Sequence, residues 1–292
     1  MTTATYTGVT TNKNELGFVC MIWGLGFLWC FVDVFQHRRT TEKGRASSLL
    51  AYGTMVATAV WLLRVCDSAT SLTCLSLGGF LIVLTSLRNV AKRPGLVHVL
   101  AIVTLCGALF AIFVAPSLLT MVGRKSTLTG RTELWQFVLP LAGNPVFGTG
   151  FESFWLGQRL DYMWRVYWWH PNEAHDGYLE IFLNLGWVGI ALFASFVIRG
   201  YGKVVAGLRR MEGMNSLRLA YIVAALIYNV TESASRELNP VWISLLFATM
   251  VPLALPTSGD GPTPRAEYAD EHVSEDPKPT WFDPLAVQES EI

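Results

Sequence analysis

Long apolar stretches, separated by short polar connections, dominate the chain. A helix needs about 20 apolar residues to cross the core of a bilayer. These runs are continuous, unlike the alternation over about 10 residues that marks a membrane β-strand. The pattern therefore predicts an all-α membrane protein with about seven transmembrane helices. The predicted spans are residues 16–35, 49–65, 72–87, 96–114, 179–198, 217–228 and 241–255.

Composition supports this interpretation. The chain is 52% hydrophobic and only 15% charged, with a mean hydropathy of +0.38, whereas soluble domains carry about a quarter charged residues. The formal net charge of zero gives no indication of a nucleic-acid partner. The cysteines show no CxxC spacing, which argues against a zinc site.

Basic residues cluster in the first, third and fifth connections, which predicts that these connections are cytoplasmic. The long fourth connection, residues 116–177, contains five basic and five acidic residues and would then face outward. The N-terminus would also lie outside and the C-terminus inside. Residues 1–256 are predicted to be the membrane domain, with a periplasmic loop at 116–177. Residues 257–292 carry nine acidic and two basic residues, which predicts a disordered cytoplasmic tail.

The start of the long loop combines an arginine with a predicted helix. Apolar residues recur at helical spacing over 131–139, which suits a helix lying in the membrane interface. Arg131 falls in the first turn of that helix, where free N–H groups and the helix dipole favour anions. Its guanidinium matches phosphate geometry, and Arg124 adds nearby positive charge. Anchoring of Arg131 to lipid headgroups is an equal alternative.

The end of the loop carries a histidine. His175 precedes the fifth predicted span, and it titrates near neutral pH, so it could act as a general base. Glu173, Asp176 and Glu180 could orient its ring. A surface histidine is the alternative. The spacing of His170 from these residues matches no standard zinc set, so no metal is predicted.

Other polar groups lie near the predicted outer face. Lys13 and Asn14 precede the first span, and Glu232 follows the sixth. Polar groups at a membrane edge are functional candidates. Glu232 and Arg236 also have the i,i+4 spacing of a simple helical salt bridge. Gly148 and Gly150 indicate a tight turn. The aromatic residues of 151–169 are typical of an interfacial belt, although one or two could stack on sugars.

Six short motifs follow one another along the chain. They are the segment 8–17, Asp67-Ser68-Ala69-Thr70-Ser71, Thr129-Gly130-Arg131 with Trp135, Gly148-x-Gly150, His175-x-Gly177-Tyr178-Leu179-Glu180 and Leu185-Gly186-x-x-Gly189. Together they resemble the O-antigen ligase and polysaccharide polymerase superfamily.

The resemblance implies a multi-span bacterial inner-membrane protein with a large periplasmic loop. It also implies metal-independent transfer of a glycan from a polyprenyl-diphosphate carrier to a glycan or lipid acceptor hydroxyl, without a cofactor. The loop arginine of the family corresponds to Arg131, which would hold the diphosphate, and the loop histidine to His175, which would be the base.

Three departures from the family pattern stand out. Asp176 replaces an asparagine, Asn12 replaces a histidine, and family members carry several more spans before residue 8. The chain is therefore predicted to be a C-terminal portion of a longer membrane protein. We predict an exopolysaccharide polymerase or O-antigen ligase in which Arg124, Lys13, Asn14 and Glu232 bind substrate. A lipid-linked glycan transporter and a non-catalytic truncated remnant are the alternatives.

Overall fold

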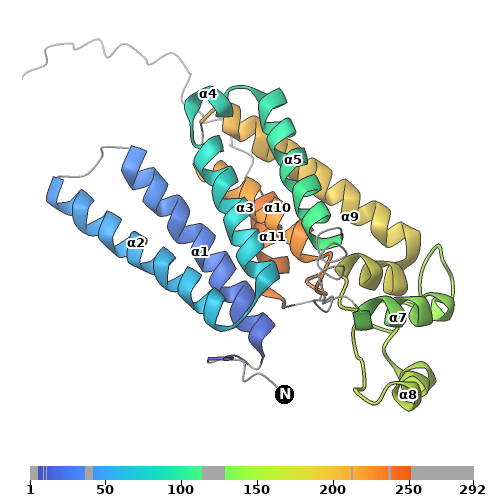
Figure 1. The fold of residues 1–292 in the computed structure, drawn as a ribbon. Helices are drawn as coiled ribbons and strands as arrows, with labels where there is room; N and C mark the ends of the chain where they lie inside the picture. Colours follow the sequence, from blue (N-terminus) through green and yellow to red (C-terminus); the bar gives the residue numbers. More distant parts are fainter. Residues whose placement is uncertain are drawn as a thin grey trace, which may run out of the picture. The chain divides into compact units, whose positions relative to one another are not determined.

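The computed structural model of the chain describes residues 6–8, 10, 12–36, 42–113, 129–211, 213–235 and 238–250, all within one compact unit, Met1–Val251. The regular secondary structure of these residues is helical, and their only strand-like pairing is a bridge between Asn144 and Gly148. The predicted tail, 257–292, lies outside the described residues. The helices are α1 (Lys13–Gln36), α2 (Glu42–Val65), α3 (Ala69–Thr85), α4 (Arg88–Ala91), α5 (Pro94–Phe113), α7 (Thr129–Val138), η1 (Leu139–Leu141), α8 (Gly157–Val166), α9 (Gly177–Arg209), α10 (Asn215–Tyr228) and α11 (Pro240–Thr249) (Figure 1).

Within the described residues, each predicted apolar stretch lies largely on a helix. Four helices in the described residues are long and apolar enough to span a membrane, namely α1, α2 from Gly44, α5 and α9. The stretches of α3, α10 and α11 form shorter apolar helices. The all-α, multi-pass membrane class is thereby confirmed.

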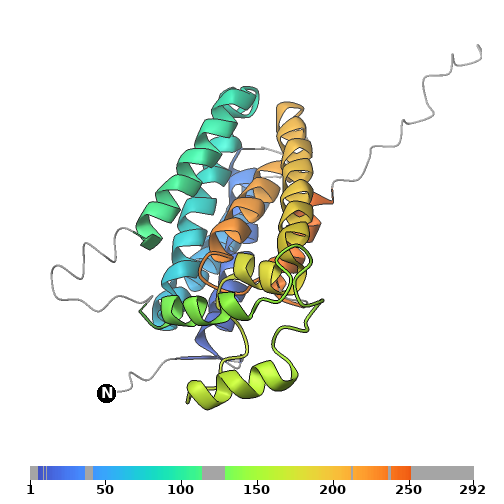
Figure 2. The same ribbon diagram turned by 90° about the vertical axis from the view of Figure 1, so that its right-hand side faces the viewer.

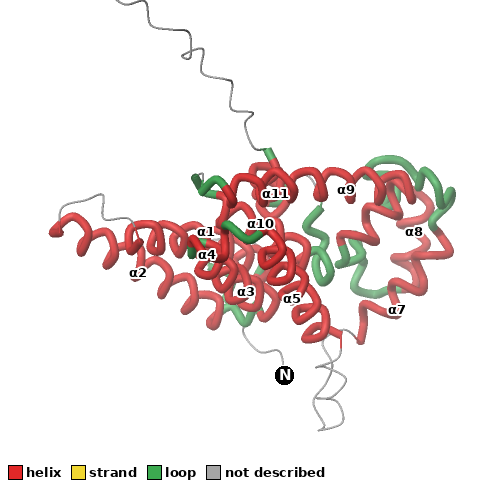
Figure 3. The backbone as a smooth tube through the Cα atoms, turned by 90° about the horizontal axis from the view of Figure 1, so that it is seen from above, coloured by secondary structure: helices red, strands yellow, loops and turns green. Residues whose placement is uncertain are grey.

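Helix α10 lies at the centre of the bundle. It packs against α1, α3, α5, α9 and α11 (Figure 3). Most of its side chains are buried, and Leu219, Ala220 and Ile222 are fully inaccessible. By contrast, α2 lies at an edge and exposes large apolar side chains such as Leu50 and Trp61. Such exposure suits contact with lipid, because a soluble surface of this kind would be an aggregation site.

The two ends of the bundle carry different connections. Asn14 at the start of α1 donates a hydrogen bond to Glu232, and the hydroxyls of Thr70 and Thr231 lie 3.2 Å apart. These contacts bring the start of α1, the α2–α3 connection and the segment after α10 to one end. Helices α7 and α8 of the long loop lie at that end too (Figure 2), whereas α4 lies at the opposite end (Figure 1).

Helix α9 differs from the prediction of a single span at 179–198. It extends to Arg209, and it is broken at Gly186, whose φ of 62° is not helical. Residues 145–150 of the loop lie against the break. There the amides of Trp187 and Val188 donate to the carbonyls of Pro145 and Val146, at 2.9 and 3.1 Å.

Hydrogen bonds from the loop to α9 complete the junction between them. The amides of Thr149 and Gly150 donate to the carbonyls of Leu183 and Asn184, at 3.1 and 2.9 Å. A Cβ at Gly148 or at Gly186 would overlap the facing backbone. The two glycines therefore let the two backbones approach closely enough to satisfy the hydrogen bonds that the break leaves open.

The long loop has a small core of its own, which corrects one prediction. The apolar face of α7 was expected to lie in the membrane interface. Instead Leu134 and Val138 are fully buried against other loop residues and against Leu183 of α9. The loop supplies apolar partners of its own, because Phe154, Trp155 and Met163 fill the same core. This core fixes the loop on the first turns of α9.

Candidate functional site

Three polar side chains from distant parts of the chain meet at the carboxylate of Glu232. Its Oε1 accepts a hydrogen bond from Nη2 of Arg131 at 2.9 Å. Its Oε2 accepts one from Nδ2 of Asn14 at 3.2 Å and lies 3.7 Å from Nδ1 of His175. The Glu232 side chain is only 15% exposed, so each contact is partly shielded from water and correspondingly stronger.

Helix α7 directs Arg131 toward this carboxylate. Besides the bond to Glu232, Nη1 of Arg131 donates to the carbonyl oxygen of Thr231. One turn further along α7, the indole Nε1 of Trp135 donates to the carbonyl oxygen of Ala174 at 2.8 Å. Helix α7 is thus bonded to the residue that precedes His175. A guanidinium has five N–H donors, so these two bonds leave capacity for an anion.

His175 lies between two carboxylates. Its Nδ1 is 2.8 Å from Oε1 of Glu173 as well as 3.7 Å from Glu232. The contact with Glu173, followed by that with Glu232, raises the pKa of His175 to about 9, although burial opposes the shift. The ring is therefore mostly an imidazolium at neutral pH. The residue has a φ of 53°, a conformation that is uncommon outside glycine and typical of functional sites.

The residues that follow His175 begin α9. Asp176 caps the helix, because its carboxylate accepts from the amides of Tyr178 and Leu179 at 2.9 and 3.0 Å. Burial raises the pKa of Asp176, against the opposing effect of these two amides and of Arg131. Both asparagine and aspartate are good caps, so Asp176 can start the helix as an asparagine would.

Gly177 joins α9 to the end of α10. Its amide donates to the carbonyl oxygen of Asn229 at 2.8 Å, and its own carbonyl accepts from the hydroxyl of Ser235 at 2.9 Å. A Cβ at this position would overlap the side chain of Asn229. This close approach sets the position of Glu232, which follows α10, relative to His175.

The buried carboxylate of Glu180 holds the residues just before α9 in place. Glu180 is 4% exposed and accepts from the amide of Ala174 at 2.5 Å and from Nε1 of Trp155 at 2.9 and 3.1 Å. Nδ2 of Asn184 lies 3.4 Å from the same carboxylate. Glu180 therefore positions the backbone next to His175, rather than the imidazole ring as the sequence suggested.

A cavity of about 350 Å³ opens beside these groups. Its polar wall includes Lys13, Asn14, Glu173, His175 and Glu232. The start of α1 is fixed by Asn12, whose Oδ1 accepts from the amides of Asn14 and Glu15 at 3.0 and 2.9 Å. The cavity is thus lined by both signs of charge.

The structure brings together Arg131, His175, Asn14 and Glu232. The last three line the cavity together with Lys13, and Arg131 reaches it through its contact with Glu232. Arg124 and Arg236 lie outside the described residues. The possible pair of Glu232 with Arg236 therefore stays untested. Glu232 itself follows the end of α10 at Tyr228, and its carboxylate pairs with Arg131.

Sequence reasoning missed several residues that line the cavity, among them Phe18, Tyr228, Ser233 and Asn239. Tyr228 is almost fully buried and reads in the sequence as an ordinary apolar-helix residue. Asn239 caps α11 by accepting from the amide of Val241 at 2.9 Å. The Asn239-Pro240 pair, typical of a helix start, is the sequence signal for this cap.

Comparisons with known proteins identify the family of the chain. The family model described as O-Antigen ligase matches residues 13–194. Over 212 residues the chain is 27% identical to the exopolysaccharide production protein ExoQ of Rhizobium meliloti (strain 1021), in an alignment covering 68% of this chain and 46% of that protein. The chain thus spans about half the length of the curated relative it matches. No solved structure matches the chain.

Proposed function

The chain belongs to the O-antigen ligase family, and we propose that it transfers a glycan from a polyprenyl-diphosphate carrier to an acceptor hydroxyl at the periplasmic face of the bacterial inner membrane. The observation that carries this proposal is the convergence of Arg131 and His175 on Glu232 beside a cavity. The name of the relative, an exopolysaccharide production protein, favours a polymerase over a ligase.

In this reaction the acceptor oxygen attacks the anomeric carbon of the carrier-linked sugar. The bond from that carbon to the phosphate oxygen breaks, and the diphosphate departs with the electron pair. Arg131 would neutralise the departing charge, because a preorganised cation in a shielded site stabilises charge that develops in the transition state. Lys13 and Asn14 would contact the same substrate from the wall of the cavity.

His175 would accept the proton of the acceptor hydroxyl. With a pKa of about 9, roughly 1% of the ring is neutral at pH 7. Transfer should therefore accelerate about tenfold per pH unit below pH 8 and level off near pH 9. If the rate instead falls between pH 7 and pH 9, the active form of His175 is the imidazolium. A neighbouring carboxylate would then accept the proton of the acceptor hydroxyl.

The transporter alternative requires ionisable groups that line a path near the middle of the membrane. Among the described residues, the cluster around Glu232 instead lies at the end of the bundle where α1 begins. This placement favours an enzyme. The other alternative, a non-catalytic truncated remnant, differs from an enzyme only in lacking transfer activity, so only an activity assay distinguishes the two.

The test is transfer in proteoliposomes, with a polyprenyl-diphosphate oligosaccharide as donor and release of polyprenyl diphosphate as the readout. We expect Arg131→Ala and His175→Ala each to reduce the rate at least a hundredfold. Two exposed residues of the same loop provide matched controls, Arg165→Ala and His170→Ala, which should retain wild-type rates. Full activity of both site variants would reject the proposed function.

A further inference from the structure

A second polar cavity lies at the opposite end of the bundle, where α1, α3, α4 and α9 end or begin. It has a volume of about 640 Å³. Arg88, Lys92, Arg209 and Arg210 line it, and no carboxylate lines it among the residues that the structure describes. Two of these cations come from α4 and the residue that follows it, and two come from the end of α9. The cavity is therefore a cation-rich site assembled from segments far apart in the chain.

The walls between the cations are partly apolar. Leu87 and Met211 line the cavity and are each 45% exposed. Met211 has a φ of 57°, which is strained for a side chain of this kind. Its amide donates to the carbonyl of Leu208 at 2.9 Å. This turn holds the apolar side chain of Met211 beside the cations. An amphipathic ligand needs such a combination of charged and apolar contacts.

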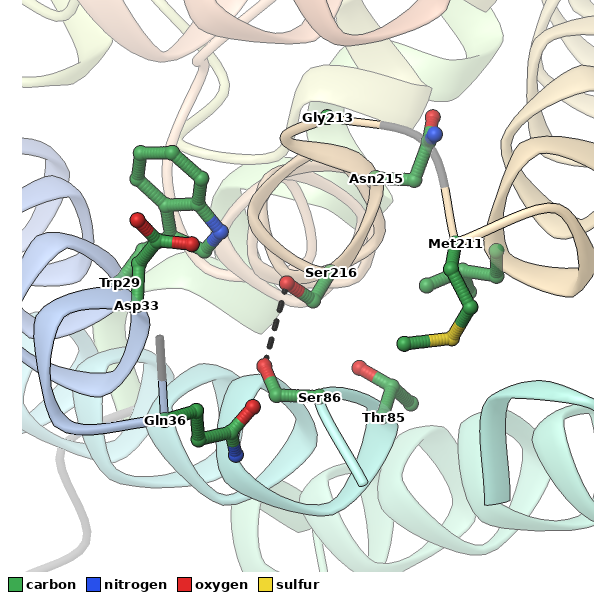
Figure 4. Close-up of a pocket in the computed structure, with 10 residues that line it drawn as sticks. Trp29, Asp33, Gln36, Thr85, Ser86, Met211, Gly213, Asn215 and Ser216 are labelled. Atoms are coloured by element: carbon green, nitrogen blue, oxygen red, sulfur yellow. Dashed lines mark hydrogen bonds between the residues drawn. The ribbon is translucent and has the colours of Figure 1, made fainter. Parts of the chain in front are cut away.

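A smaller cavity of about 90 Å³ adjoins the first and shares Gln36, Ser86 and Met211 with it. Figure 4 shows Ser86 and Ser216 facing each other across it, and the Ser86 hydroxyl donates to that of Ser216 at 3.4 Å. Asp33 and Asn215 also line the smaller cavity. Its hydroxyl, amide and carboxylate groups match the hydrogen-bonding groups of a polyol.

We propose that the two cavities bind the headgroup of an anionic glycerophospholipid of the phosphatidylglycerol class. The phosphodiester would lie among Arg88, Lys92 and Arg209, and the headgroup glycerol would face Ser86 and Ser216. The acyl chains would leave over Leu87 and Met211. Basic pockets between transmembrane helices on the cytoplasmic side are a recognised form of anionic-lipid site. The site is distinct from the cluster around Glu232, so it stands or falls independently of the glycan-transfer proposal.

The competing explanation is that these cations only set membrane orientation. Under that explanation every basic residue at this end is equivalent. Arg199 and Lys203 provide the comparison, because both are exposed on α9 and neither lines the cavity. The proposal requires the cavity cations to differ from this pair in lipid binding.

The experiment measures retention of phosphatidylglycerol by the full chain in nanodiscs of phosphatidylcholine containing a titrated fraction of phosphatidylglycerol, read by native mass spectrometry. Each cation near an anionic surface contributes about fivefold, so Arg88→Gln with Arg209→Gln should weaken binding about 25-fold. The control pair Arg199→Gln with Lys203→Gln should change it less than twofold. All four side chains are exposed, so loss of the fold is not expected, and circular dichroism of each variant checks this.

Two outcomes would overturn the proposal. Equal weakening by the two double variants would show that the cations act only as general surface charge. Displacement of the lipid by millimolar inorganic phosphate at constant ionic strength would show a site for free anions rather than for a lipid.

Discussion

Replacing Glu232 with glutamine tests whether one carboxylate organises the cluster. Glutamine keeps the size of the side chain and its ability to accept from Asn14, but it removes the charge that faces Arg131 at 2.9 Å and His175 at 3.7 Å. We expect the pKa of His175 to fall, since Glu232 is the second contributor to its value of about 9. Glu173, the larger contributor, remains in place.

The size of the fall follows from distance and shielding. Two unit charges 3.7 Å apart interact by about 1 kcal/mol at the dielectric constant of water and by about 4 kcal/mol at an effective value of 20. The His175 side chain is 28% exposed, so we take the lower part of this range. A change of about 1.4 kcal/mol lowers the pKa by about 1, which raises the neutral fraction at pH 7 to roughly 10%.

The assay is a pH titration of ¹⁵N-histidine-labelled protein by NMR. The chain has five histidines, and His175→Gln identifies the resonance in question. The pH–rate curve of glycan transfer should shift by the same amount as the NMR titration. Glu173→Gln, which removes the contact at 2.8 Å, should shift both further. If the pKa of His175 is the same in Glu232→Gln as in the wild type, the imidazole does not sense Glu232 and the shared-carboxylate arrangement is wrong.

Three further results are expected. Gly177→Ala should lower the thermal stability and abolish transfer, because the new Cβ overlaps Asn229. The control is Gly202→Ala in the same helix, which should be neutral or stabilising because nothing lies within 4 Å of its Cβ. Unchanged stability of Gly177→Ala would contradict the close approach of Gly177 to Asn229. Trp155→Phe should destabilise the protein by about 1–3 kcal/mol in denaturant titrations, because the buried Glu180 loses a donor. The pKa of His175 is raised in the folded protein, so its contribution to the free energy of unfolding should be greatest below pH 6.5. This contribution should decline by at most about 3 kcal/mol as pH rises through 9. His175→Gln should lack the decline.

The apolar pattern predicted the helices because a bilayer requires every backbone group of a span to be bonded within its own segment. It could not predict the break at Gly186. There the missing bonds come from residues 145–150, which are distant in sequence and leave the apolar pattern of α9 unchanged. The contact of Glu232 with Arg131 could not be predicted for a related reason. Glu232 follows the end of α10 at Tyr228, and the cation that reaches it comes from α7, about 100 residues earlier in the chain.

The two departures from the family pattern that the structure describes, Asn12 and Asp176, fall at helix starts. Oδ1 of Asn12 accepts from two amides of α1, and Oδ1 of Asp176 accepts from two amides of α9. The contacts that converge on Glu232 come instead from Arg131, Asn14 and His175. A cap contributes about 1 kcal/mol to a helix and can be supplied by several residue types. Both departures therefore preserve the positions of α1 and α9, and with them the convergence of charges on which the proposed transfer depends.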